Sequence, residues 1–194
     1  NANGEKVDVW ETQVFKDESP NAFALPGSKI GVHTGMITLA STPDQLAAVI
    51  GHEIGHVKSR HGAERVSLGL GASAIQQIAE IGLQQNENSQ VLLAAIGLGS
   101  QFGVILPYSR THESEADEIG LFYMARAGFD PQQSVELWKG MSKASGGKGP
   151  MEFMSTHPSN KTRIKQLSDN MPKANKIYEK AIQNNIKPVC PKPA

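Results

Sequence analysis

The spacing of apolar residues divides the chain into two parts. Up to residue 40 the apolar residues form short runs rich in valine, isoleucine, alanine and phenylalanine, at residues 7–9, 14–15, 22–25 and 29–33. Turn-forming residues at 17–21 and 26–28 bound these runs, which is typical of strands joined by tight turns. The pattern therefore predicts a small β-sheet within residues 1–40, with a hairpin over residues 22–33.

From residue 41 onward the apolar residues recur every three or four positions, which is the spacing of amphipathic helices. The first helix has a clear start: Thr42 can cap it, Pro43 suits its first position and Gln45 can complete a capping box. Further helices are predicted at residues 64–84, 89–106, 109–127, 131–144, 160–170 and 173–184, with a glycine-containing loop at 145–158. We thus expect an α+β fold. It would form one domain over residues 1–194, with a helical core at 41–185 and a Pro-rich tail at 186–194.

Gly51 and Gly55 are four residues apart, so they share one face of the first predicted helix. A glycine inside a helix is less favourable than an alanine by about 1 kcal/mol. Two such residues on one face therefore predict that the backbone of another segment packs very closely against that face.

Length and charge narrow the class of protein. With 194 residues, 19 basic and 19 acidic side chains, the chain can form a core and has no net field to attract nucleic acid. The most apolar stretches, at 68–83 and 91–106, are interrupted by polar residues and fall short of the roughly 20 apolar residues that span a bilayer. We therefore expect no transmembrane segment and interpret both as buried helices, with peripheral membrane association as the alternative.

The pentapeptide His52-Glu53-Ile54-Gly55-His56 lies within the first predicted helix. Histidines four residues apart present both imidazoles on one helix face, where they can bind the same metal ion. Glu53 then lies beside the metal without being required as a ligand. Zinc could activate a water molecule there while Glu53 accepts its proton. The motif predicts a zinc-dependent hydrolase, provided that a third ligand lies elsewhere in the chain.

The predicted helix at 109–127 offers four candidates for the third ligand, namely His112, Glu113, Glu115 and Asp117. Glu113 and Asp117 are four residues apart and share a face, so one could bind the metal while the other orients a ligating histidine. This spacing modestly favours Glu113 over Glu115. It also leaves open that the segment is an exposed acidic helix face with no metal.

Three motifs in this order resemble one family: His-Glu-Ile-Gly-His at 52–56, Ser-Arg-Thr-His-Glu-Ser-Glu-Ala-Asp at 109–117, and Ser-Thr-His-Pro at 155–158 followed by Arg163. Together they are similar to the HtpX-like and CaaX-prenyl-protease-like zinc metallopeptidases, which are gluzincins. The similarity runs from about Asn21 to Arg163, and residues 21–27 also resemble the soluble bacterial branch. The resemblance implies a mainly helical zincin-like core and a small sheet whose edge strand, near residues 29–33, flanks the metal site.

The resemblance also implies roles for the residues that match the first two motifs. His52, His56 and Glu113 correspond to the ligands of one Zn²⁺ ion per chain, and Glu53 corresponds to the general base. Asp117 corresponds to the carboxylate that lies behind a ligating histidine and orients it.

His157 and Arg163 correspond to the family's histidine and arginine near the open metal position, where either could stabilise the oxyanion of the intermediate. For Arg163 the alternative is an ordinary salt bridge on its helix. His157 lies in a loop that contains three glycines, and neutral imidazole is a good zinc ligand. We hypothesise that His157 can occupy the fourth zinc position and hold the enzyme latent. The alternative is that His157 never contacts the metal.

The other histidines are expected to take no part in the site. His61 follows His56 by five residues, so a continuing helix would rotate it off the ligand face and onto the surface. His112 would point about 100° away from the face of Glu113. His33 ends a predicted strand and is expected to be a surface residue.

These features together predict a zinc metalloendopeptidase that acts in protein quality control. An exposed edge strand beside a metal can bind an unfolded polypeptide as an additional strand, with weak preference for side chains. The expected partners are therefore unfolded or misfolded polypeptides. The alternative is a chaperone-like protein that binds unfolded polypeptide with little turnover. The resemblance further implies a periplasmic or outer-membrane-associated location in a bacterium.

Overall fold

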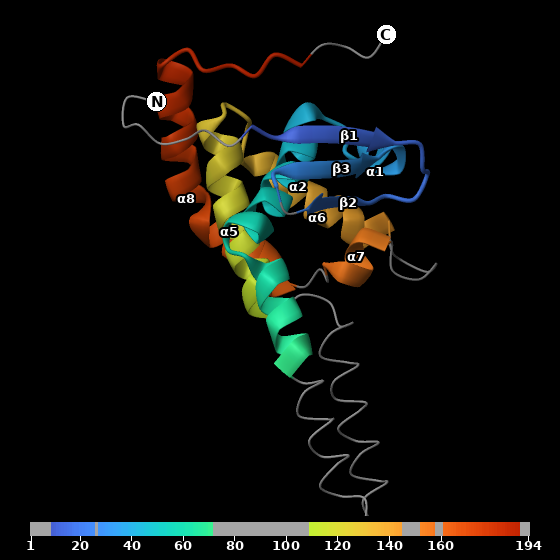
Figure 1. The fold of residues 1–194 in the computed structure, drawn as a ribbon. Helices are drawn as coiled ribbons and strands as arrows, with labels where there is room; N and C mark the ends of the chain where they lie inside the picture. The colour runs from blue at the N-terminus through green and yellow to red at the C-terminus, as the bar shows by residue number, and fades with distance from the viewer. Residues whose placement is uncertain (1–8, 26, 72–108, 145–151, 158–160, 191–194) are drawn as a thin grey trace, which may run out of the picture.

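The computed structural model describes residues 9–25, 27–71, 109–144, 152–157 and 161–190 (Figure 1). The helix predicted at 89–106 lies outside these residues, as does most of the one predicted at 64–84, of which residues 64–71 are helical. Over the part of the chain that is described, no helix has the length and apolar character needed to cross a membrane.

The N-terminal residues form a three-stranded sheet of β1 (Glu11–Phe15), β2 (Ala22–Leu25) and β3 (Lys29–His33). The predicted hairpin is confirmed, since β2 and β3 pair antiparallel with Leu25 opposite Lys29. The expectation that residues 29–33 form the edge strand was wrong. The strand order is β1-β3-β2, so β3 is central and β2 is the edge nearest α2. The hairpin by itself allows a third strand to pair with either β2 or β3. In the structure, β1 pairs in parallel with β3.

The first helices follow the sheet directly. Helix α1 (Thr34–Leu39) was not predicted, because its residues were assigned to the sheet region. Helix α2 (Pro43–Lys58) begins as predicted. The Thr42 side chain accepts a hydrogen bond from Gln45 N at 3.2 Å, and the Gln45 side chain accepts one from Ser41 N at 3.2 Å. The cap at Thr42 is therefore confirmed, with the return hydrogen bond made one residue earlier than in a standard capping box.

The remaining helices are α5 (Arg110–Arg126), α6 (Gln132–Ala144), α7 (Glu152–Thr156) and α8 (Lys161–Gln183). Helix α7 lies within the segment predicted as a loop, which corrects that prediction for residues 152–156. The predicted break at Pro172 was also wrong, since α8 continues through it. Buried residues lie on both sides of the proline, among them Leu167 and Ala174. Packing of this stripe outweighs the lost backbone hydrogen bond that makes proline unfavourable in a helix.

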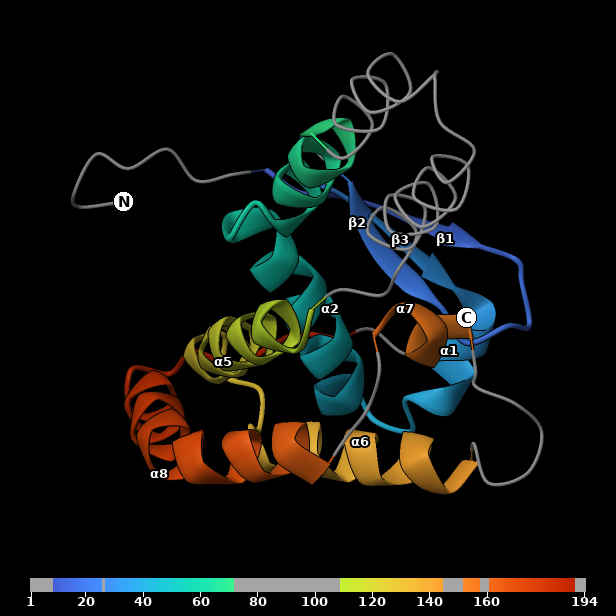
Figure 2. The ribbon, with the colours of Figure 1, turned by 90° about the horizontal axis from the view of Figure 1, so that it is seen from below.

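Helices α2 and α5 pack with their backbones almost touching, as the two glycines predicted. A Cβ atom added to Gly51 would lie 2.8 Å from Gly120 O, and one added to Gly55 would lie 2.7 Å from Ala116 O. Neither position has room for a side chain. The absence of side chains at this crossing lets α2 and α5 lie directly against each other, and Figure 2 shows the two helices crossing.

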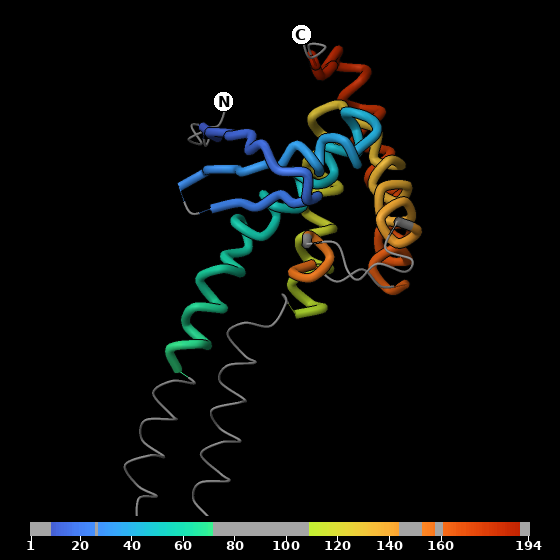
Figure 3. The backbone as a smooth tube through the Cα atoms, turned by 90° about the vertical axis from the view of Figure 1, so that its right-hand side faces the viewer, coloured from blue at the N-terminus to red at the C-terminus, as the bar shows by residue number. Residues whose placement is uncertain are grey.

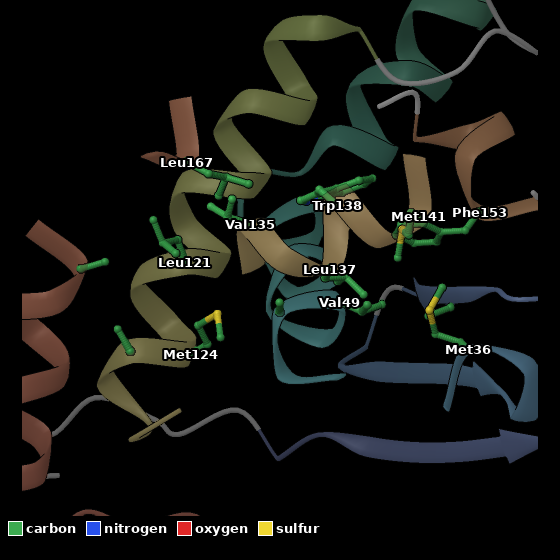
Figure 4. Close-up of a cluster of buried hydrophobic side chains, with 14 of the residues drawn as sticks. Met36, Val49, Leu121, Met124, Val135, Leu137, Trp138, Met141, Phe153 and Leu167 are labelled. Carbon is green, nitrogen blue, oxygen red and sulfur yellow. The ribbon is translucent and has the colours of Figure 1, made fainter. Parts of the chain in front are cut away.

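The core lies between the sheet and the outer helices. Figure 3 shows α2 and α5 between the sheet on one side and α6 and α8 on the other. Buried apolar side chains from all these helices meet in the interior, and Figure 4 shows Val49, Leu121, Trp138, Met141 and Phe153 among them. This core holds α2, α5 and α8 rigidly around the polar residues described next.

Candidate metal centre

The predicted site residues come together from three helices and from the residue that follows a fourth. Helices α2, α5 and α8 and the residue after α7 contribute polar side chains, all at most 4% exposed: His52, Glu53, His56, Glu113, Asp117, His157 and Arg163. Burying this many titratable groups in one place is costly unless they satisfy one another or bind an ion.

Four of these side chains direct one donor atom each toward a common point. His52 Nε2 lies 3.0 Å from His56 Nε2 and 3.2 Å from His157 Nδ1. Glu113 Oε1 lies 3.4 Å from His56 Nε2 and 3.1 Å from His157 Nδ1, and Glu113 Oε2 lies 3.5 Å from His52 Nε2. Ligand atoms around a tetrahedral zinc ion are separated by about 3.3 Å, given zinc–ligand bonds of about 2.0–2.1 Å. The observed separations therefore match a single zinc ion surrounded by these four donors.

The charges of this cluster also suit a divalent cation. Burial lowers the pKa of His56 to about 3, despite its hydrogen bond to Glu113, so its imidazole is neutral. Burial would raise the pKa of Glu113, but hydrogen bonds with three histidines hold it far below the ordinary value for a carboxyl group. Burial would lower the pKa of His52, but hydrogen bonds with Asp117 and Glu113 raise it to about 9. An ionised carboxylate thus faces imidazoles, one of which would give up a proton when a metal binds.

Asp117 and Arg163 lie behind the donor atoms. Asp117 Oδ1 is 2.9 Å from His52 Nδ1, on the side of the ring away from the other donors. Arg163 donates to Asp117 from Nε at 2.6 Å and from Nη2 at 2.7 Å, and its Nη1 lies 2.6 Å from Glu113 Oε2. The guanidinium also lies 3.9 Å over the ring of Trp138. Arg163 therefore links the two carboxylates of α5, and its ion pairs are buried rather than on the helix surface.

Glu53, which follows His52 on α2, is not among the four donors. Its Oε2 accepts a hydrogen bond from Ala24 N of β2 at 3.2 Å. Its Oε1 is buried, receives no hydrogen bond from the described residues, and lies 3.5 Å from His157 Nε2. Burial raises the pKa of Glu53 above the ordinary value, against the opposing effect of the nearby histidines. A carboxylate with a raised pKa and a free oxygen is suited to accept a proton near neutral pH.

His157 is held in place by the short helix α7. Its backbone N–H donates to Phe153 O at 2.9 Å, and its ring stacks on Phe153 with 4.6 Å between ring centres. Phe153 is itself buried, and its backbone N–H donates to Pro20 O at 3.3 Å. The structure thus places His157 Nδ1 with the donors of α2 and α5. This is the position expected if His157 occupies the fourth zinc position.

His61 was predicted to lie on the surface, and that prediction was wrong. Its side chain is 2% exposed, and its Nδ1 lies 3.0 Å from His56 Nδ1. The prediction extended the helix of His56 too far. Helix α2 ends at Lys58, and Arg60 adopts a left-handed φ of 56°, so the next helical segment starts in a new direction. That change of direction turns His61 back toward His56.

An apolar cavity of about 690 Å³ lies on a different face of α2. Ile50 and Ile54 are among the residues that line it, and they lie about half a turn away from His52 and His56 on the helix. The cavity is therefore separate from the polar cluster, and it plays no part in the chemistry inferred for that cluster.

Comparison with known proteins agrees with the donor cluster. The profile of peptidase family M48 matches residues 1–171. The chain belongs to peptidase family M48. This confirms the prediction of a zinc metallopeptidase family, and zinc is the cofactor of this family.

Curated relatives in this family come from several organisms. The chain is 41% identical over 167 residues to the mitochondrial metalloendopeptidase OMA1 of Schizosaccharomyces pombe, covering 85% of this chain and 48% of the relative. It is 37% identical over 159 residues to the enzyme of that name from Arabidopsis thaliana, covering 82% of this chain and 31% of the relative. It is 29% identical over 178 residues to the β-barrel assembly-enhancing protease of Escherichia coli, covering 89% of this chain and 36% of the relative. The chain thus spans half or less of these relatives.

Proposed function

We propose that this protein is a zinc endopeptidase that hydrolyses peptide bonds of unfolded or misassembled proteins, as part of protein quality control. The observation that carries the proposal is the cluster of four donor atoms at zinc-like separations, with the free oxygen of Glu53 beside it. Relatives named as metalloendopeptidases and as a protease that enhances β-barrel assembly support it. Because those relatives are longer than this chain, the substrates remain part of the proposal.

His52, His56 and Glu113 would hold the zinc ion, and Asp117 would orient His52 through its Nδ1 atom. When bound, zinc supplies a Lewis acid that polarises the scissile carbonyl and lowers the pKa of a water molecule. Glu53 Oε1 is positioned to accept the proton of that water and to pass it to the leaving amine. The hydrogen bond from Ala24 N keeps the other oxygen of Glu53 in place during both transfers.

Arg163 and His157 complete the proposed catalytic machinery. Arg163 Nη1 and Nε contact Glu113 and Asp117, so its charge stabilises the buried carboxylates on which the zinc site depends. We propose that His157, when it is displaced from the donor cluster, stabilises the oxyanion, since an imidazolium near that oxygen favours the charged intermediate over the substrate.

The free edge of β2 offers a binding mode for an extended polypeptide. His33 N donates to Asn21 O at 2.9 Å, so the alternating backbone groups of Ala22 and Ala24 face away from β3. The contact between Ala24 N and Glu53 shows that this edge borders the site. An unfolded chain that added to β2 would place a backbone carbonyl near Glu53 and would be recognised mainly through its backbone.

The position of His157 supports a latent state. Its Nδ1 occupies the place of a fourth donor, which leaves no room for a substrate carbonyl. We expect His157→Ala to weaken zinc binding by at least about tenfold, since even outer partners of a ligand contribute 10–100-fold. At saturating zinc the same variant should cleave casein faster than wild type.

Zinc affinity and the rate of casein cleavage are both measured. Removing a latch raises the cleavage rate at saturating zinc, whereas removing a purely catalytic residue lowers it. His33→Ala is the matched control, since His33 contacts Ser19 at 3.2 Å and lies apart from the donor cluster. Slower cleavage by zinc-saturated His157→Ala would contradict the latch, because it would show that the lost oxyanion contact outweighs any relief of blocking.

The proposed function is tested with the wild-type protein. We expect about one zinc ion per chain and slow cleavage of casein, both lost on treatment with a chelator and restored by added zinc. Binding of unfolded casein without cleavage, in wild type and in His157→Ala alike, would contradict the endopeptidase and favour the chaperone-like alternative.

We also propose a branch of the family and a cellular location for this protein. We retain the HtpX-like soluble bacterial branch and a periplasmic or outer-membrane-associated location. The similarity to the Escherichia coli protease supports both, while relatives named as mitochondrial share the same region of sequence.

A further inference from the structure

We propose that His61 positions the zinc ligand His56, and that Glu115 on the surface of α5 fixes His61 in turn. His61 lies outside the three motifs that define the site, and Glu115, although it lies within the second motif, has been given no role at the metal. The inference rests on the proposed function, because it assigns a role in holding the metal. It starts from the contact between His61 Nδ1 and His56 Nδ1, which are 3.0 Å apart.

The two helix-borne histidine ligands have different partners behind them. His52 has Asp117 at its Nδ1 atom, which is the usual carboxylate arrangement for a ligating histidine. His56 instead meets a second imidazole. A ligating ring must be held in one orientation, so the group at its outer nitrogen contributes to metal affinity.

The hydrogen atoms along this chain of contacts have one consistent arrangement. If His56 binds zinc through Nε2, its Nδ1 carries a hydrogen, which it donates to His61 Nδ1. His61 then carries its hydrogen on Nε2, which lies 3.3 Å from Glu115 Oε2.

Glu115 is held on the opposite side by α2. Its Oε1 accepts a hydrogen bond from Ser59 Oγ at 2.8 Å, directly after α2 ends. The His61 ring also stacks on His112 with 4.2 Å between ring centres. His61 is therefore confined from two sides, and its donor end points at a carboxylate that is 53% exposed.

The proposal predicts that the acceptor at His61 matters, and two substitutions isolate it. His61→Leu fills the buried space without an acceptor, whereas His61→Asn places Oδ1 where the imidazole Nδ1 was. We expect His61→Leu to weaken zinc affinity by about 10–100-fold. His61→Asn should bind zinc nearly as tightly as wild type. Affinity is measured by competition with a chelator, and ligand geometry by the visible spectrum of the Co²⁺-loaded protein.

Glu115, at the surface end of this series of contacts, has a matched control in Glu64. Glu115 and Glu64 are similarly exposed carboxylates, and each pairs with one of the two stacked imidazoles, Glu64 with His112 at 3.1 Å. We expect Glu115→Ala to weaken zinc affinity several-fold and to alter the Co²⁺ spectrum. Glu64→Ala should change neither, because Glu64 pairs with His112, which is not part of the proposed series of contacts from His56 to Glu115.

Three results would overturn the proposal: unchanged zinc affinity in His61→Leu, equal losses in His61→Leu and His61→Asn, or equal affinities in Glu115→Ala and Glu64→Ala. The third comparison stands even if a substitution at the buried His61 prevents folding. Failure of the proposed function would be recognised separately, since wild type itself would then bind no zinc or would bind unfolded casein without cleaving it.

Discussion

Glu53→Gln is expected to abolish nearly all cleavage of casein while leaving zinc bound. Gln keeps the size of the side chain and can still accept the hydrogen bond from Ala24 N, but it cannot take up a proton. General acid–base groups contribute about 10²–10⁴-fold to rate, so we expect a loss in kcat of about a thousandfold. Initial rates and zinc content are measured on the same preparations.

Glu136→Gln is the control for this substitution, because Glu136 is an exposed carboxylate on α6 that pairs with Lys139. It should match wild type in rate and zinc content. Cleavage by Glu53→Gln within a few-fold of wild type would remove Glu53 from the reaction. Loss of zinc from Glu53→Gln would show instead that the carboxylate is needed to form the site.

Arg163→Met is expected to lower the free energy of unfolding of the zinc-free protein by about 3–5 kcal/mol. Arg163 is 1% exposed, and its guanidinium is the cation paired with both Glu113 and Asp117. Methionine keeps an apolar stem beside Trp138 but leaves two buried carboxylates without that partner. The cost is that of uncompensated buried charge, and urea denaturation of the metal-free protein measures it.

Lys165→Met is the control for Arg163→Met, because it removes an exposed salt bridge from the same helix. Lys165 pairs with Asp169, and both side chains are more than half exposed, so solvent screens the interaction. Its unfolding midpoint should stay close to that of wild type. Equal destabilisation by Arg163→Met and Lys165→Met would show that the buried pairs add nothing beyond an ordinary surface pair.

The sequence predicted those parts of the site for which metal binding and close helix packing allow few residue types and spacings. The spacing of His52 and His56 requires a helix, and Gly51 and Gly55 correctly predicted a close neighbouring backbone. Spacing alone favoured Glu113 over Glu115 only modestly, because both lie within the first turns of the same helix. The structure explains the difference: Glu113 faces α2 at the donor cluster, and Glu115 faces the end of α2 at Ser59.

The errors arose where tertiary contacts outweigh local pattern. Pro172 does not end α8, because the buried stripe continues on both sides of it. The central position of β3 depends on which strand β1 pairs with, and short strands carry no local signal for that choice. His61 was misplaced because a single left-handed residue, Arg60, changes the chain direction after α2.

The crossing at Gly51 and Gly55 has a consequence for how this protein can change over evolution. There the distance between α2 and α5 is set by main-chain atoms in contact, with no side chain between them to grow or shrink. Substitutions elsewhere in the interior can therefore accumulate without altering how far the histidines of one helix stand from the glutamate of the other. The spacing of the two ligand-bearing helices is thus inherited through positions that carry only a hydrogen atom, Gly51, Gly55 and Gly120, where any side chain would force the backbones apart.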